Sequence, residues 1–338
     1  MRTPPFRVTA LLLALAALVP ACAGCATGTA ADQGAASAPR TAATASARAA
    51  TAYTPYVSAT TAAATDRAGS PDTYNLAFVV ADGDACTPLW GGSASATDPA
   101  VVSRVAALTA SGADVRVSFG GAAGTEPALA CATARELADA YGAVLDAVGA
   151  TKADFDIEGA ALTDTASVTR RNEALHLLQQ ERDLDVTYTL PVMPDGLEAS
   201  GTAVLDDAVA EDVDVSAVNI MAMNYSTSDD GDMGDYAEQA ASAAHDQVAG
   251  VLGLSDAEAW QALHITAMIG VNDVAGETFT LADAASLRSF ARRQGVGALS
   301  LWASFRDRPC TDGGTTEASD ICSGVAQEDG AFAEALSG

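Results

Sequence analysis

The sequence predicts a single α/β domain over residues 51–338, a barrel of eight parallel strands with helices between them. Short apolar runs of strand length alternate with longer amphipathic stretches along this region, and no internal segment has the composition of a linker. A doubly wound open sheet would show the same alternation. However, the glycine-rich turn that holds phosphates in dinucleotide-binding folds is missing after the first strands, which favours the barrel.

The expected elements follow from this alternation. The eight expected strands are Pro55–Ala59, Tyr74–Val80, Val115–Phe119, Ala153–Glu158, Val186–Leu190, Val218–Met223, Ile265–Ile269 and Ala298–Trp302. Amphipathic helices are expected between them, for example at Thr133–Ala147, Val168–Arg182 and Leu281–Gln294, with a last one near Glu328–Leu336. Active sites of such barrels lie at the C-terminal ends of the strands, so polar residues there are the candidates for function.

Residues 1–25 are typical of an export signal. Two basic residues, Arg2 and Arg7, precede an apolar run from Val8 to Val19 that is shorter than the ~20 residues needed to span a bilayer. The segment ending at Cys22 also resembles a lipoprotein cleavage box, so either ordinary cleavage or lipidation of Cys22 is expected. Both alternatives predict a secreted protein or one anchored to the outer face of the membrane.

Residues 26–50 are expected to form a tether, because they are almost all Ala, Thr, Ser and Gly and cannot build a core. The whole chain carries 17 basic and 44 acidic side chains, a net charge of −27. This charge argues against binding to nucleic acid or to anionic membrane surfaces, both of which attract basic patches. The sequence implies no protein partner, and a monomer is expected.

Four cysteines lie beyond the signal region, and an even number in an exported chain predicts disulfides. The favoured pairing is Cys86–Cys131 with Cys310–Cys322. The second pair would close a short loop rich in Gly, Thr and Asp, which stabilises the fold by ~3 kcal/mol in the chain-entropy model. A metal site is the disfavoured alternative, because no Cys-x-x-Cys motif occurs and the chain has three histidines. No metal and no cofactor are expected.

The expected strand at Ala153–Glu158 carries three acids. Residues two apart in a strand share a face, so Asp154, Asp156 and Glu158 point one way and Phe155 and Ile157 the other. In a parallel barrel the apolar pair packs on helices and the acids face the interior. Acids buried together share protons and spread their pKa values apart, as general acid catalysis requires. The alternatives are a solvated edge strand and a metal-binding acidic cluster.

Several motifs resemble, in the right order, those of family 18 glycoside hydrolases, the chitinases. Asp154-Phe155-Asp156-Ile157-Glu158 resembles the core of the family's acidic signature, and the other matching segments are Ser118–Gly121, Tyr188–Leu197, Met221–Tyr225, Ile269–Asp273, Trp302 and the tail that bears Cys310. The resemblance covers essentially all of residues 51–338. The chain departs from the signature at its first acid, where it has Thr151, which bears on rate rather than on reaction type.

The resemblance implies a role for each acid and for one aromatic residue. Glu158 would protonate the leaving oxygen and then act as base, while Asp156 would orient the sugar's acetamido group and stabilise the cationic intermediate. Asp154 would share a proton or a hydrogen bond with Asp156. Tyr225 would donate a hydrogen bond to the acetamido carbonyl oxygen, and Trp302 would stack on the sugar.

Other residues are assigned to sugar binding or to structure. Met223 and Asn224 are expected in the sugar-binding wall, with Asn224 holding the acetamido group or Asp156. Trp90 is either a sugar platform or a loop aromatic packed by the Cys86 disulfide. Ser118, Gly120 and Gly121 are expected to be structural, because glycine lets backbones approach closely.

The resemblance, with the expected export signal, implies a secreted chitinase that hydrolyses β-1,4-linked N-acetylglucosamine polymers or oligomers, with retention and assistance by the substrate. Two alternatives stay open. One is an endo-β-N-acetylglucosaminidase acting on N-glycans or peptidoglycan, and the other is a non-catalytic carbohydrate-binding relative. Aromatic residues make up 5% of the chain, which favours short oligosaccharides over a long aromatic-lined cleft.

Overall fold

Parallel strands close into a barrel in the computed structural model, which describes residues 50–311 and 314–338. The expected signal segment, its Cys22 and all but the last residue of the expected tether lie outside the described residues. The barrel strands are β1 (Ala52–Tyr53), β2 (Tyr56–Ser58), β3 (Thr73–Asp82), β6 (Asp114–Gly120), β7 (Lys152–Asp156), β8 (Asp185–Met193), β10 (Ala217–Ala222), β11 (Leu263–Met268) and β14 (Ala298–Trp302). The eight-stranded α/β barrel that the sequence predicts is therefore confirmed.

The barrel closes through a broken first strand. β1 pairs in parallel with β14, and β2 pairs in parallel with β3. The remaining order is β3-β6-β7-β8-β10-β11-β14, with every neighbouring pair parallel. Because all these strands run the same way, their C-terminal ends meet at one edge, and the side chains that follow them converge there.

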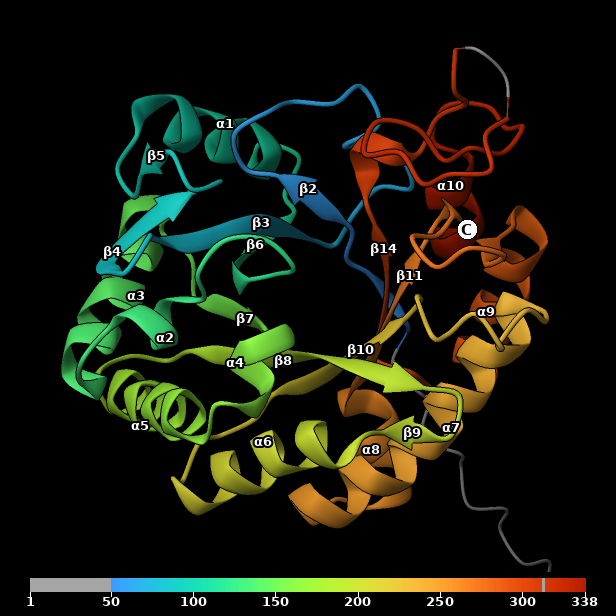
Figure 1. The fold of residues 1–338 in the computed structure, drawn as a ribbon. Coiled ribbons are helices and arrows are strands. Elements are labelled where there is room, and N and C mark those ends of the chain that lie inside the picture. The colour runs from blue at the N-terminus through green and yellow to red at the C-terminus, as the bar shows by residue number, and fades with distance from the viewer. Residues whose placement is uncertain (1–49, 312–313) are drawn as a thin grey trace, which may run out of the picture. The chain divides into compact units, whose positions relative to one another are not determined.

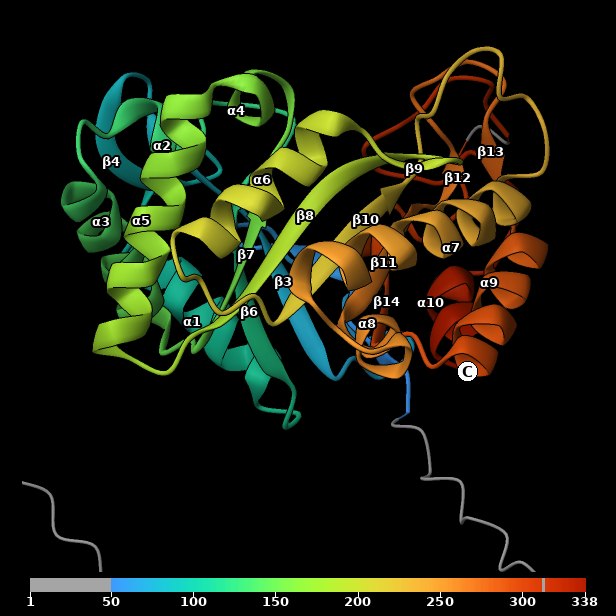
Figure 2. The same cartoon turned by 90° about the horizontal axis from the view of Figure 1, so that it is seen from below.

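Helices surround the strands (Figures 1 and 2). They are α1 (Pro99–Thr109), α2 (Pro127–Ala130), α3 (Ala134–Val148), α4 (Gly159–Thr163), α5 (Thr165–Glu181), α6 (Ala199–Ala210), α7 (Met233–Leu252), α8 (Asp256–Ala262), α9 (Leu281–Gln294) and α10 (Ala331–Ser337), with a 3-10 turn, η1, at Ser304–Arg306. The four expected helices correspond to α3, α5, α9 and α10. None of the helices in the described part of the chain combines the length and the apolar character needed to span a bilayer.

Local sequence explains where the helix next to the acidic strand begins and ends. Thr133 and Glu136 form a capping box at the start of α3, which satisfies backbone N–H groups that lack partners inside the helix. Gly149 ends α3 in the left-handed conformation, with φ 66°. The chain then enters β7 directly, so this short connection sets where the three acids lie.

Short antiparallel strands extend two barrel strands at their ends. β4 (Ala85–Trp90) pairs with β3, β5 (Ala94–Ser95) pairs with β4, and β9 (Gly196–Leu197) pairs with β8. A separate hairpin joins β12 (Gly270–Val271) to β13 (Thr278–Phe279). The predicted disulfides Cys86–Cys131 and Cys310–Cys322 are confirmed, and the first ties β4 to the residue after α2.

Candidate active site

The acidic strand has the orientation that its alternation predicts. Phe155, on the outer face of β7, stacks on Phe119 of β6 with centroids 5.4 Å apart and meets Tyr141 of α3 edge-on at 5.1 Å. The neighbouring positions Asp154 and Asp156 point into the barrel and are 1% and 5% exposed. Glu158 lies two residues further, just past the strand end, and is half-buried. The solvated-edge alternative is therefore wrong.

Asp154 is held by hydroxyl groups from three other barrel strands. Its Oδ2 accepts hydrogen bonds from Tyr56 Oη at 2.9 Å and Ser118 Oγ at 2.5 Å, and its Oδ1 accepts one from Thr189 Oγ1 at 2.6 Å. Burial raises the pKa of Asp154, while these hydrogen bonds and the charge of Arg116 oppose the rise. Asp154 thus accepts three hydrogen bonds, all from hydroxyl groups. The sequence had led us to expect a hydrogen bond or a shared proton with Asp156, and this expectation is corrected.

The same network continues round the barrel interior. Asn219 of β10 donates through Nδ2 to Thr189 Oγ1 at 2.9 Å and to Tyr56 Oη at 3.2 Å. Its Oδ1 accepts from Thr266 Oγ1 of β11 at 2.9 Å. One polar layer therefore links six of the barrel strands beneath the pocket and fixes their relative positions.

Asp156 and Glu158 form a coupled pair above this layer. Burial and the neighbouring charges of Glu158 and Asp154 hold the pKa of Asp156 well above its usual value. Burial also raises the pKa of Glu158, although the hydrogen bond with Asp156 opposes that rise. The two directions place a proton on Asp156, donated toward Glu158. Asp156 Oδ1 is buried and has no hydrogen-bond partner among the described residues, so the pair retains an open acceptor.

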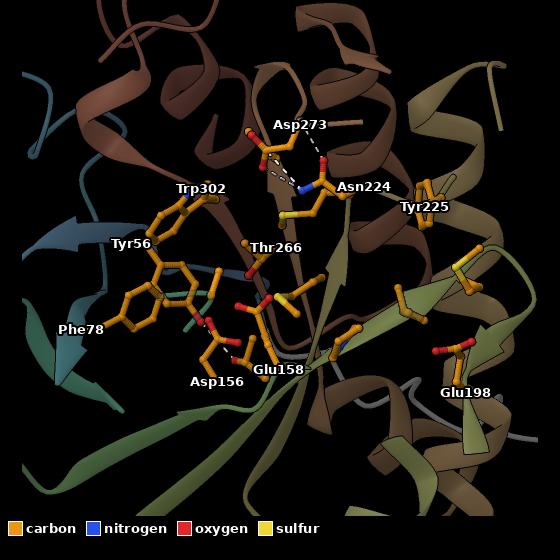
Figure 3. A pocket seen from close by; sticks show the side chains of 18 residues that line it. Tyr56, Phe78, Asp156, Glu158, Glu198, Asn224, Tyr225, Thr266, Asp273 and Trp302 are labelled. Carbon is orange, nitrogen blue, oxygen red and sulfur yellow. Dashed lines mark hydrogen bonds between the residues drawn. The ribbon is translucent and has the colours of Figure 1, made fainter. Parts of the chain in front are cut away.

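The pair lies in a pocket of about 540 Å³ at the C-terminal edge of the barrel (Figure 3). Trp302, Phe78 and Tyr56 form its aromatic side. The Trp302 and Phe78 rings stack with centroids 5.3 Å apart, and Tyr56 meets Trp302 edge-on at 5.8 Å. This side offers an apolar surface next to the acids, as the sequence predicts for Trp302. In the described residues, no group of three or more His, Cys, Asp or Glu side chains is arranged to hold a metal ion.

Two glycines let β6 and Phe78 approach the acids. Gly120 has φ 98°, and a Cβ there would lie 2.1 Å from the backbone oxygen of Asp156. Gly121 has φ 89°, and its Cβ would lie 2.8 Å from the Phe78 ring. The Gly121 N–H donates to the Asp156 carbonyl at 3.0 Å. Any larger side chain would push β7 or Phe78 away from the pocket.

Met223 and Asn224 line the pocket, but the contacts of Asn224 correct its expected role. Asn224 has φ 53°, and its Oδ1 accepts from the Asp273 N–H at 2.9 Å and from the Val274 N–H at 3.2 Å. Its Nδ2 donates to Asp273 Oδ2 at 3.2 Å. Asn224 therefore fastens its loop to the hairpin after β11, and its hydrogen bonds do not go to Asp156. The alternative that it contacts the acetamido group stays a prediction.

Tyr225 also lines the pocket. Figure 3 shows it across the pocket from Asp156 and Glu158. Its ring meets Tyr236 of α7 edge-on at 5.9 Å, and its hydroxyl has no partner among the described residues. Its hydroxyl is therefore open to a ligand in the same pocket as the acid pair, and its assignment to an acetamido carbonyl oxygen stays a prediction.

The prediction of Trp90 as a sugar platform is wrong. Trp90 has no exposed surface, belongs to the hydrophobic core and does not line the pocket. The reason is that β4 turns back antiparallel on β3 and packs the indole inward, beside the helices that the Cys86–Cys131 disulfide ties to it. The alternative of a packed aromatic is the correct one.

Sequence reasoning missed much of the pocket. Residues that line it without having been predicted include Tyr56, Phe78, Thr189, Met193, Glu198, Met221, Thr266, Met268 and Asp273. Strand alternation could have found several, because Met221 lies two residues before the predicted Met223, and Thr266 lies two residues before Met268. Glu198 and Asp273 follow irregular turns, for which no periodic signal exists.

Comparisons with known proteins agree with this geometry, although no family model matches the chain. The chain is 36% identical over 283 residues to a probable bifunctional chitinase/lysozyme of Escherichia coli, covering 78% of this chain and 31% of that protein. It is 34% identical over 276 residues to endochitinase 11 of Metarhizium anisopliae, covering 76% and 52%. The chain thus spans about a third to a half of the length of these curated relatives.

Solved structures give the same result at the level of the domain. The catalytic domain of a hyperthermophilic chitinase from Pyrococcus furiosus matches with a TM-score of 0.75 and 28% identity, covering 86% of this chain and 95% of that one. A GH18 chitinase from Pseudoalteromonas aurantia matches with a TM-score of 0.53 and 17% identity, covering 75% and 94%, which bears on the fold alone.

Proposed function

The chain belongs to family 18 of the glycoside hydrolases, and on this premise we propose that it is a chitinase that cleaves β-1,4-linked N-acetylglucosamine chains. The observation that carries the proposal is the Asp156–Glu158 pair, whose pKa values are both raised, in a pocket beside the Trp302 ring. A carboxylic acid that keeps its proton at mildly acidic pH is the group that glycoside cleavage requires.

The first step breaks the glycosidic bond. Glu158 gives its proton to the leaving oxygen as the bond between that oxygen and the anomeric carbon breaks. The carbonyl oxygen of the sugar's own 2-acetamido group attacks the anomeric carbon, and a cyclic oxazolinium ion forms. Trp302 would hold the apolar face of this sugar, and the stacked Phe78 and edge-on Tyr56 would keep the indole in place.

Asp156 supports the substrate's nucleophile rather than acting as one. Its unpaired Oδ1 would accept the acetamido N–H, which orients the carbonyl oxygen toward the anomeric carbon. Asp156 supplies negative charge next to the cationic intermediate once its proton has passed to Glu158. In the second step Glu158 takes a proton from water, and the water oxygen bonds to the anomeric carbon from the face that the leaving group left. The bond between the anomeric carbon and the acetamido oxygen breaks at the same time, which restores the acetamido group, and the configuration is retained.

One comparison favours a second candidate, cleavage of peptidoglycan glycan strands. The Escherichia coli relative is described as a probable bifunctional chitinase/lysozyme. The non-catalytic alternative is not favoured, because Asp154, Asp156 and Glu158 are all present and two of them line the pocket.

Export of the protein is part of the proposal. The two disulfides support it, because such bonds form and persist in oxidising compartments outside the cytoplasm. Fractionation of producing cells would test it, and palmitate labelling of wild type and Cys22→Ala would separate a lipid-anchored protein from a freely secreted one.

Hydrolysis of a fluorogenic N,N′-diacetylchitobioside by wild type and by Glu158→Gln tests the enzymatic proposal. Wild type should release the fluorophore, and Glu158→Gln should do so at least ~10²-fold more slowly because it has no proton to give. Asp139→Asn, which changes an exposed acid on α3, is the matched control and should keep the wild-type rate. Binding of chitooligosaccharide without turnover by wild type would contradict the proposal and support a carbohydrate-binding role.

A further inference from the structure

Methionines make up a large part of the apolar lining of the pocket. Four of the six methionines of the chain line the pocket: Met193, Met221, Met223 and Met268. Methionine is flexible and polarizable, so it forms an apolar wall that adapts to ligands of different shape. Such a wall fits the apolar faces and acetamido methyl groups of hexosamines and places little steric restriction on them.

The carboxyl groups that line the pocket can carry only negative charge, and no basic side chain accompanies them among the described residues. Its four ionisable carboxyl groups belong to Asp156, Glu158, Glu198 and Asp273, and no lysine, arginine or histidine is among the described residues that line it. Glu198 begins helix α6 at the far end from the acid pair, while Asp273 lies on the hairpin after β11 (Figure 3). Both are exposed to solvent, so both side chains are accessible to a ligand.

Arg306 is a buried cation near the pocket, but a ligand in the pocket does not contact its positive charge. Arg306 interacts electrostatically with Asp273, but it does not line the pocket. Its Nη2 donates to the backbone oxygens of Ile269 at 3.1 Å and Val271 at 2.8 Å, which fixes it in the interior. Among the described residues that line the pocket, a ligand therefore meets carboxyl groups and no positively charged side chain.

Two polar atoms of the pocket lack partners, and this points to a ligand that is polar but uncharged or positive. Asp156 Oδ1 and Tyr225 Oη are buried, in residues that are 5% and 7% exposed, and neither has a hydrogen-bond partner among the described residues. Buried polar atoms normally have partners. Hydroxyl and amide groups of a sugar would supply them without adding negative charge.

We propose that this pocket selects substrates by charge, accepting neutral and cationic hexosamine units and rejecting units that carry a carboxylate. Glu198 and Asp273 impose the selection on sugars that lie beside the cleaved one. The inference rests on the proposed function and decides between its two candidates: chitin and partly deacetylated chitin are substrates, and glycan strands with the lactyl carboxylates of N-acetylmuramic acid are not.

Binding to Glu158→Gln tests the selection without turnover. Calorimetry at low ionic strength would compare chitotetraose, a tetrasaccharide of alternating N-acetylglucosamine and N-acetylmuramic acid, and the same tetrasaccharide with its lactyl carboxylates converted to amides. Acid and amide have nearly the same bulk, so their affinity ratio isolates charge. Each like-charge contact at a wet surface weakens binding about fivefold, and we expect the acid to bind at least ~10-fold more weakly than the amide.

Variants then assign the effect to residues. Adding Glu198→Gln and Asp273→Asn should narrow the acid-to-amide ratio to about twofold, and 0.5 M salt should narrow it as well, because salt screens exposed charges. Asp195→Asn is the matched control, since Asp195 is an exposed acid on the β8–β9 turn, three residues before Glu198, but does not line the pocket.

Equal binding of acid and amide, or a ratio that the two substitutions leave unchanged, would overturn the inference and leave the chitinase proposal intact. Failure of the chitinase proposal is seen separately, as the absence of chitotetraose hydrolysis by wild type. Tighter binding of the acid than of the amide would reverse the assignment and favour peptidoglycan.

Discussion

Two aspartates of one strand have different surroundings in the barrel interior: Asp154 belongs to the polar layer beneath the pocket (the lower layer), and Asp156 belongs to the acid pair above it (the upper layer). Asp154 and Asp156 lie two residues apart on the same face of β7, and both are buried. Asp154 accepts three hydroxyl hydrogen bonds from neighbouring strands, whereas Asp156 has an unpartnered oxygen and a pKa that burial and Glu158 raise well above its usual value. The contrast teaches that one face of a strand can serve the fold at one position and chemistry two residues later.

The largest expected difference is in rate, from Asp156→Asn. This change removes the charge that stabilises the cationic intermediate but keeps the size of the side chain, so kcat should fall ~10²- to 10⁴-fold. Thermal unfolding at neutral pH should be unchanged or shifted upward, because the variant no longer buries an ionisable carboxyl group beside the charges of Glu158 and Asp154. If Asp156→Asn lost stability and kept the wild-type kcat, the assignment of Asp156 to catalysis rather than to the fold would be contradicted.

Removing the Asp154 carboxyl group should mainly lower the free energy of unfolding. Asp154→Ala leaves a small cavity and takes the acceptor away from Ser118, which has no exposed surface. The free energy of unfolding, measured with denaturant, should fall by about 3 kcal/mol. Asp154→Asn, which keeps an acceptor oxygen, should lose less and is the control. An unchanged unfolding free energy in Asp154→Ala would show that the polar layer does not hold the barrel.

The Asp156–Glu158 pair should make the free energy of unfolding depend on pH. The folded state keeps the Asp156 proton to a higher pH than the unfolded state, whose aspartate pKa is about 3.9. The stabilisation is therefore complete below that value and is lost as pH rises through the raised folded pKa. Asp156→Asn removes this loss, so its unfolding free energy relative to wild type should rise from pH 4 to pH 7. A difference that stays constant over this range would contradict the raised pKa.

The smallest expected effect comes from one hydroxyl of the lower layer. Ser118→Ala removes one of the three hydrogen bonds to Asp154 and should lower the free energy of unfolding by about 1.5 kcal/mol. The rate should stay within about twofold of wild type, because Ser118 does not line the pocket. A large loss of rate would mean that the lower layer also tunes the acid pair.

The features that could be predicted are periodic or local. Alternation in Asp154–Glu158 set the inward face of β7, and the apolar runs set all eight barrel strands. The features that could not be predicted depend on turns. Trp90 is buried because β4 folds back on β3, and a left-handed residue, Asn224, redirects the loop that carries Tyr225.

The two acids that line the pocket outside the Asp156–Glu158 pair could not be predicted from the sequence for the same reason. Glu198 and Asp273 come from the ends of two short hairpins, and they meet the strand-end residues only once the barrel closes. No pattern in the sequence connects these distant positions, because strand and helix periodicities describe single elements rather than the turns that bring them together.

Direct titration of the two aspartates tests the account most closely. Carbon-13 NMR of labelled aspartate side chains would follow both carboxyl groups through a pH series in wild type, with Asp154→Asn and Asp156→Asn for assignment. We expect Asp156 to titrate well above Asp154 and to shift in Glu158→Gln, which changes its partner. If the two groups titrated together, or if Glu158→Gln left Asp156 unchanged, the proposed proton sharing between Asp156 and Glu158 would be refuted.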